Sequence, residues 1–295
     1  MASNRRPELA ALRNEYELAV QKPVSPDVDV RARLSAWERV WGVGALRKAV
    51  ILIGMATLWQ CYALWLDNAF MVPTFTDTLR ALYTYFANGE LPKATLTSLR
   101  VLGIAYSIGV LAAGILTLLA LTSRIGADIL EMCIGMFNLL PSIALLPMAL
   151  LWFGIGYGGV IFVIIYSVTW PTALNIHAGF TGVSKTLRMV GRNYELYWFS
   201  YVFKLLIPAA LPNILTGLKI GWAFSWRTLI ASELVFGVAS GNGGIGWFIF
   251  EKKNQLEIAV VFAGLVTIII IGLLVENIVF KLLENATIRK WGMKS

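Results

Sequence analysis

The chain has 295 residues, of which 58% are hydrophobic and 14% charged, and its mean hydropathy is +0.70. These values exclude an ordinary soluble domain and indicate a polytopic membrane protein. The formal net charge of +8 is compatible with nucleic-acid binding, but the basic residues cluster between apolar stretches. This distribution is typical of a membrane protein, and we therefore expect no nucleic-acid partner.

The first 48 residues are polar, and we expect a cytoplasmic leader without a signal peptide. Leu34, Trp37 and Trp41 recur at helical spacing, which predicts an amphipathic helix in the second half of this leader. Two arrangements are compatible with the pattern: a helix along the inner membrane interface, and a helix packed on protein.

Six apolar stretches follow, each close to the roughly 20 residues that a helix needs to cross a bilayer. They predict an all-α transmembrane domain over residues 49–280 and a cytoplasmic tail over residues 281–295. The expected spans are Ala49–Leu66, Leu99–Leu121, Met132–Leu151, Gly159–Leu174, Leu211–Leu234 and Ile258–Phe280. Prolines and glycines in "LLPSIALLPMALLWFGIG" predict a kinked third span, which suits a helix that faces a cavity.

The charge distribution predicts that both termini are cytoplasmic. The leader has nine basic and six acidic residues, and loop 178–206 and tail 281–295 each have four basic and one acidic. The two long loops on the other side, residues 67–96 and 237–257, together have four basic and five acidic residues. Basic residues are enriched in cytoplasmic loops, and an even number of spans requires both ends on one side. In the second outer loop we expect tight turns in "GVASGNGGIGWF".

Loop 178–206 is longer than a simple reversal of the chain needs. Lys185, Arg188, Arg192 and Glu195 recur at steps of three or four, which predicts one amphipathic helix with all four charges on one face. This face either contacts a partner or only faces water and lipid headgroups.

The fifth span contains residues that are costly in a membrane. Pro208 and Pro212 predict a sharp boundary at which the span begins. A charge at mid-bilayer costs about 2.5–3.5 kcal/mol on insertion scales, so Arg227 and Glu233 should face protein or water. Arg227 is a candidate to line a pathway and contact an anion transiently; the alternative is a bond to backbone carbonyls or to Glu276. 

Arg100 is expected at the outer start of the second span. Its side chain either snorkels to the membrane surface or contacts an anion at the outer mouth.

Five segments between about Val72 and Lys290 resemble, in the same order, those of one family. They are "VPTFTDTLRAL", "TLTSLRVLGIAYSIGVLAAGI", "LLPSIALLPMALLWFGIGYGG", "LLIPAALPNILTGLKIGWAFSWRTLIASEL" and "FGVASGNGGIGWFI". The family is that of the permease subunits of ATP-binding cassette importers of the nitrate, sulfonate, taurine and bicarbonate type. The resemblance implies a type I importer permease-like fold with a cytoplasmic coupling loop at about residues 178–206.

The family's loop has a Glu-Ala-Ala triplet, a Gly four residues after its last Ala, and then a proline corner. Counting back from Pro208 without gaps places Met189, Val190 and Gly191 at the triplet and Glu195 at the glycine, so neither feature is kept. A second register takes Gly191 as the family glycine but requires four extra residues before the proline. We prefer the ungapped register, which makes these residues part of the coupling loop.

The resemblance implies that the chain forms the translocation pathway for a small solute such as nitrate, bicarbonate, taurine or another sulfonate. It implies cytoplasmic ATPase subunits that bind ATP and Mg, a periplasmic or lipid-anchored binding protein, a second copy of this chain, and the bacterial inner membrane as location. No Gly-x-x-x-x-Gly-Lys-Ser/Thr loop occurs in the sequence, so we expect a non-catalytic subunit without cofactor or metal.

Two other function classes would require features of their own in the sequence. An ion-gradient-driven secondary transporter would place paired carboxylates in corresponding halves, and only Glu233 and Glu276 qualify. An integral membrane enzyme would need a cluster of His, Cys or carboxylate residues, which the sequence does not offer.

Overall fold

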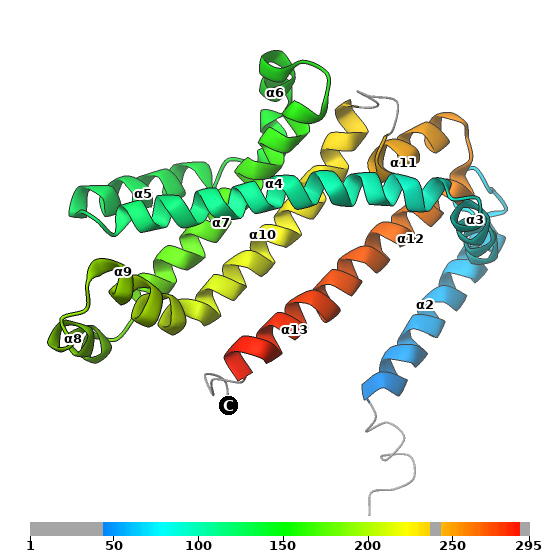
Figure 1. The fold of residues 1–295 in the computed structure, drawn as a ribbon. Coiled ribbons are helices and arrows are strands. Elements are labelled where there is room, and N and C mark those ends of the chain that lie inside the picture. The colour runs from blue at the N-terminus through cyan, green and yellow to red at the C-terminus, as the bar shows by residue number, and fades with distance from the viewer. Residues whose placement is uncertain (1–43, 237–242, 290–295) are drawn as a thin grey trace, which may run out of the picture. The chain divides into compact units, whose positions relative to one another are not determined.

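A computed structural model describes residues 44–236 and 243–289, and within these ranges the regular secondary structure is helical (Figure 1). The predicted leader helix with Leu34, Trp37 and Trp41 lies outside the described residues. The chain divides into two compact units, Met1–Thr57 and Leu58–Ser295. The first unit contributes the beginning of helix α2 (Gly44–Leu66), whose apolar side chains are largely exposed, as expected for a surface that meets lipid.

Five of the described helices are long and apolar enough to cross a membrane. The first three are α2, α4 (Glu90–Ala120) and α7 (Tyr157–Thr181). The fourth is a continuous helix that ends in α10 (Ile207–Phe236). The fifth begins with α12 (Ile258–Leu274) and continues through Val275–Phe280, α13 (Lys281–Glu284) and Asn285–Arg289. A sixth span exists only if α5 (Arg124–Phe137) and the segment Ser142–Phe153 count together. The prediction of about six spans therefore agrees with five helices and one broken span.

The prediction that prolines disrupt the third span, Met132–Leu151, is confirmed, but the span is divided into separate helices and is not one continuous kinked helix. α5 ends at Phe137, and the chain bends by 87° before a short 3₁₀ turn (Ser142–Leu145) and α6 (Leu146–Phe153). Pro141 explains the break, because it lacks an N–H and disfavours helical geometry at the residue before it. The prolines therefore interrupt this helix instead of bending it.

The core of the second unit is the crossing of α7 with α4 and α10 (Figure 1). Leu102, Val163, Ile164, Val168 and Leu229 are completely buried there. Small residues let the backbones approach closely: a Cβ added to Gly109 would stand 2.8 Å from the Cβ of Val168. These contacts fix α7 and α10, which line the pocket described below.

The fifth span does not begin at Pro208, so the predicted proline corner was wrong. A continuous helix runs from α9 (Trp198–Tyr201) through a π-helical segment (Val202–Leu206) into α10. The N–H of Ile207 bonds to the carbonyl of Val202, five residues back. This wider turn accommodates Pro208, which has no N–H to donate and whose ring would crowd the carbonyl of the turn before it.

Two shorter helices, α3 (Phe75–Ala87) and α11 (Ile245–Asn254), lie at the ends of the spans opposite to α9. The expected tight turns were wrong for residues 245–248, which form the first turn of α11, and residues 237–242 of the same segment lie outside the described ranges.

Tyr85 of α3 and Lys252 of α11 form a polar cluster with Glu257. Tyr85 donates a hydrogen bond of 2.6 Å to Glu257, and the ammonium group of Lys252 lies 4.8 Å from the centre of the Tyr85 ring. Burial and the bond to Glu257 raise the pKa of Tyr85 above its ordinary value. Burial lowers the pKa of Lys252, but Tyr85, Glu90 and Glu257 more than offset it, so that this pKa is also raised.

Candidate functional site

The predicted coupling loop contains helix α8 (Lys185–Asn193), which follows α7 after a short turn. Ser184 caps its N-terminus by accepting a hydrogen bond of 3.3 Å from the N–H of Leu187. The exposed surface of α8 combines apolar and basic side chains: Met189 is 56% exposed and Val190 42% exposed, and Lys185 and Arg192 are exposed as well. A short helix with such a mixed surface is suited to contact another protein.

Gly191 fixes how α8 packs. It is buried, and a Cβ added to it would stand 2.8 Å from a methyl carbon of Leu205 and 3.0 Å from the ring of Tyr201. Because these residues belong to the long helix that becomes α10, α8 lies directly against the foot of that span. Gly191 is therefore a packing residue of the coupling loop.

Glu195 does not share a face with the other charges of α8, which corrects the prediction of one continuous amphipathic helix. The helix ends at Asn193, and Glu195 has a φ of +47° in the turn that leads to α9. This left-handed conformation is the one that glycine adopts at lowest cost. The ungapped register, in which Glu195 occupies the place of the family's glycine, stays a prediction.

Arg188 is also not part of an open charged face. It is partly buried and its side chain points back to the end of α7, where three backbone carbonyls accept its hydrogen bonds. These bonds are Nη2 to Phe180 O at 2.7 Å, Nε to Val183 O at 3.1 Å and Nη2 to Thr181 O at 3.3 Å. Helical spacing alone could not predict this, because the spacing ignores the fold-back between α7 and α8.

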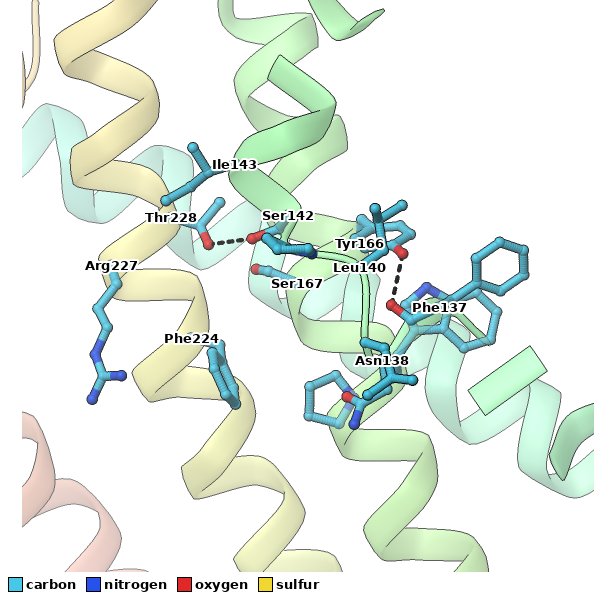
Figure 2. A pocket seen from close by; sticks show the side chains of 14 residues that line it. Phe137, Asn138, Leu140, Ser142, Ile143, Tyr166, Ser167, Phe224, Arg227 and Thr228 are labelled. Atoms are coloured by element: carbon cyan, nitrogen blue, oxygen red, sulfur yellow. Dashed lines mark hydrogen bonds between the residues drawn. The ribbon is translucent and has the colours of Figure 1, made fainter. Parts of the chain in front are cut away.

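A pocket lies at the break of the third span, between α7 and α10 (Figure 2). Its volume is about 260 Å³. Ser142 and Thr228 hydrogen-bond across it at 2.8 Å, and the hydroxyl of Tyr166 donates a bond of 2.7 Å to the carbonyl of Phe137. The remaining lining residues are Asn138, Leu139, Leu140, Pro141, Ile143, Ser167, Trp170, Pro171, Phe224 and Arg227.

Arg227 lines this pocket from α10, as a residue of a transmembrane pathway would. Figure 2 shows its guanidinium group extending from α10 on the side away from Asn138 and Leu140. The side chain is exposed, and no ion pair involves it in the ranges that the structure describes. The alternative of a bond to Glu276 was wrong, because Glu276 pairs with Lys219 at 3.1 Å.

Glu233 is buried at the far end of α10, where it holds the start of α11. Its Oε1 accepts a hydrogen bond of 2.6 Å from Ser98 and its Oε2 accepts one of 2.8 Å from the N–H of Gly246. The Ser98 hydroxyl in turn accepts a bond of 2.8 Å from the N–H of Ile245. The carboxylate and the Ser98 hydroxyl together thus satisfy two N–H groups in the first turn of α11 that have no intrahelical acceptor. Sequence reasoning missed Ser98, since nothing in its surroundings distinguishes it from other small residues of α4.

Arg100 lies well inside α4, which begins at Glu90, so its predicted place at the start of a span was wrong. The N-terminal part of α4 was predicted as loop because Glu90 and Lys93 interrupt the apolar pattern there. Arg100 is exposed and forms no ion pair within the described part of the chain. Its role as an anion contact stays a prediction.

Residues 105–289 match the family described as "Binding-protein-dependent transport system inner membrane component". The chain is 30% identical over 240 residues to the putative aliphatic sulfonates transport permease protein SsuC of Escherichia coli, covering 80% of this chain and 89% of that protein. It is 28% identical over 249 residues to the nitrate import permease protein NrtB of Synechocystis, covering 81% and 88%. It is 27% identical over 264 residues to the bicarbonate transport system permease protein CmpB of Synechococcus elongatus, covering 85% and 91%. The match includes α8, the pocket and Glu233.

Proposed function

Because this chain belongs to the family of binding-protein-dependent transport system inner membrane components, it is the permease of such an importer, and we propose that its solute is a small oxyanion. The relatives are named for aliphatic sulfonates, nitrate and bicarbonate, which are all anions with several oxygen acceptors. The observation that carries the proposal is Arg227, a cation on a membrane span with no carboxylate partner among the described residues. A permanent cation inside a membrane is tolerated where it meets water or an anion.

In this proposal the pathway runs along the surface of α10 that carries Arg227. Asn213 and Thr216 are exposed on the same helix, several turns closer to its start. Polar side chains on a span avoid lipid, which supports a protein or water environment for this surface. A second copy of the chain would close the pathway, since the Arg227 side chain beside the pocket is exposed on a single chain. Glu233 and Arg100 are further pathway candidates. Glu233 already has hydrogen-bonding partners in the protein.

We further propose that α8 docks on a cytoplasmic ATPase subunit, which binds ATP and Mg, and that both termini are cytoplasmic. A periplasmic or lipid-anchored binding protein would deliver the solute to the α3 and α11 end of the spans. The mixed surface of Lys185, Met189, Val190 and Arg192 supports the ATPase contact.

The test is co-purification of the full chain with candidate ATPase subunits, followed by uptake of labelled taurine, nitrate and bicarbonate into vesicles. A variant with Lys185, Met189 and Arg192 replaced by Ala should lose the ATPase, whereas Arg124→Ala, an exposed arginine at the start of α5, should retain it. Uptake that needs an ion gradient and no ATPase would instead assign the chain to the secondary transporters.

A further inference from the structure

We infer that Arg188 is a positioning residue that joins α8 to α7, so that a movement imposed on α8 enters the membrane through α7 as well as through the foot of the long helix on which Gly191 packs. The inference rests on the proposed function in one respect: the ATPase is what moves α8. The joint, by which we mean the hydrogen bonds between Arg188 and the end of α7, rests only on the geometry of the structure.

The first step is the shape of the contact. The Arg188 guanidinium and its Nε donate three hydrogen bonds to the carbonyls of Phe180, Thr181 and Val183, at 2.7–3.3 Å. Phe180 and Thr181 are the last two residues of α7. Carbonyls at a helix C-terminus have no intrahelical donor, and the helix dipole favours a positive charge beside them. One side chain therefore bonds to the last two carbonyls of the preceding span, of which the Phe180 carbonyl also accepts the N–H of Val183.

The second step is that this joint is rigid. The guanidinium presents its donors in a fixed planar fork, so three acceptors around it restrict rotation as well as distance. The connection between α7 and α8 is short, residues 182–184, and Ser184 caps α8 directly after it. Arg188 thus bridges a turn that would otherwise be a hinge.

The third step is the path of the movement. α7 is the most buried of the candidate spans, and it packs on both α4 and α10. Its middle lines the pocket with Tyr166, Ser167 and Trp170. A displacement of α8 that is passed to α7 therefore reaches the pocket walls directly. Lys185 and Arg192, on the same short helix, are exposed and free to contact a partner.

The experiment compares Arg188→Gln and Arg188→Lys with Arg124→Gln, an exposed arginine on the same end of the spans. Amide hydrogen exchange on the full purified chain reports the joint without any partner. We expect at least fivefold faster exchange over residues 178–190 in both Arg188 variants, because lysine keeps the charge but lacks the fork, and no change in Arg124→Gln.

The second readout uses the chain with its ATPase and binding protein in vesicles, with labelled taurine, nitrate and bicarbonate as probes. We expect the ATPase to stay bound and the ATP hydrolysed per solute taken up to rise several-fold in the Arg188 variants. A general loss of folded protein would lower both rates and leave this ratio unchanged.

Each of the other outcomes contradicts a different part of the inference. Unchanged hydrogen exchange would show that Arg188 does not make the joint. Faster exchange with an unchanged ratio would show that the joint does not transmit movement. Loss of the ATPase from both Arg188 variants would make Arg188 a docking residue. Failure of the native chain to bind any ATPase would overturn the proposed function and the transmission, whereas the exchange result would still decide the joint.

Discussion

Ser98 on α4 and Glu233 on α10 are joined by a hydrogen bond of 2.6 Å, at the point where the backbone of α11 begins. The carboxylate and the hydroxyl between them accept the N–H groups of Gly246 and Ile245. The helices α4, α10 and α11 thus meet at one buried carboxylate. This arrangement gives Glu233 a structural role, whatever its contact with solute.

Glu233→Gln should destabilise the protein by about 1–3 kcal/mol, because an amide offers one acceptor where two N–H or O–H donors need acceptors. The measurement is thermal unfolding of the purified chain, with hydrogen exchange of α11 to locate the effect. Glu276→Gln, on an exposed side chain, is the matched control. A variant of native stability that has lost uptake would instead make Glu233 a pathway residue.

Gly191→Ala should detach α8 from the foot of the long helix. The added methyl group would stand 2.8 Å from Leu205, and overpacking of this kind costs about 1–3 kcal/mol. We expect weaker co-purification of the ATPase. Gly103→Ala is the control, because a Cβ there meets nothing within 4 Å and should be neutral or slightly stabilising. Equal behaviour of the two variants would refute the packing role.

Glu195→Gly should stabilise the turn after α8 by roughly 1 kcal/mol, since a left-handed backbone costs a non-glycine residue about that much. Thermal unfolding would detect the gain. Glu195→Val should have the opposite sign, because a β-branched side chain tolerates this conformation least. A loss of stability in the glycine variant would mean that the Glu195 side chain makes a contact worth more than the strain.

Arg227→Gln should lower uptake of an anionic solute about tenfold or more, as expected from the loss of a charge-assisted contact of roughly 1.5–3 kcal/mol. Arg227→Lys should restore part of the uptake, because the charge remains. The ATPase should stay bound to both variants, since Arg227 lies far from α8 along α10. Full uptake by Arg227→Gln would argue for a structural arginine.

The contribution of Tyr85 and Lys252 to the stability of the folded chain should fall above about pH 10. Both groups have a raised pKa in the folded chain, so each ionisable group holds its proton more tightly when folded. The stability they contribute is therefore fully present below the unfolded pKa values, near 10, and is lost as pH rises through the folded ones. Thermal unfolding measured from pH 8.5 to about pH 11.5 tests this, because the loss begins near the unfolded pKa values and continues through the folded ones. Lys252→Met should be less stable than the native chain at pH 8.5 and should show a smaller further loss. An equal loss in both would exclude Lys252 as a source of the dependence.

The apolar spans were predictable from the sequence, because a bilayer imposes length and composition on every helix that crosses it. The family was predictable for another reason, the resemblance of five segments between about Val72 and Lys290 to those of its members. The contacts of single polar side chains were not. Arg188 and Glu195 have helical spacing with Lys185 and Arg192, but the helix ends between Arg192 and Glu195, and Arg188 turns back to α7. Pro208 looked like a boundary because proline rarely continues an α-helix, and a wider turn before it removes that conflict.

The π-helical segment Val202–Leu206 has a consequence for which substitutions and deletions the chain tolerates. One residue corresponds to about 100° of rotation around a helix axis. An α-helical turn holds about one residue fewer than this wide turn, so the segment absorbs an extra residue while the helix before and after it keeps its orientation. Deleting one residue from Val202–Leu206 should therefore restore an ordinary α-helical turn and leave Arg227, Thr228 and Glu233 beside their present neighbours. Deleting one residue after Pro212, where the helix has no wide turn to absorb the change, would instead rotate all three around the axis. The segment is thus the place in this long helix where a change of chain length should be tolerated best.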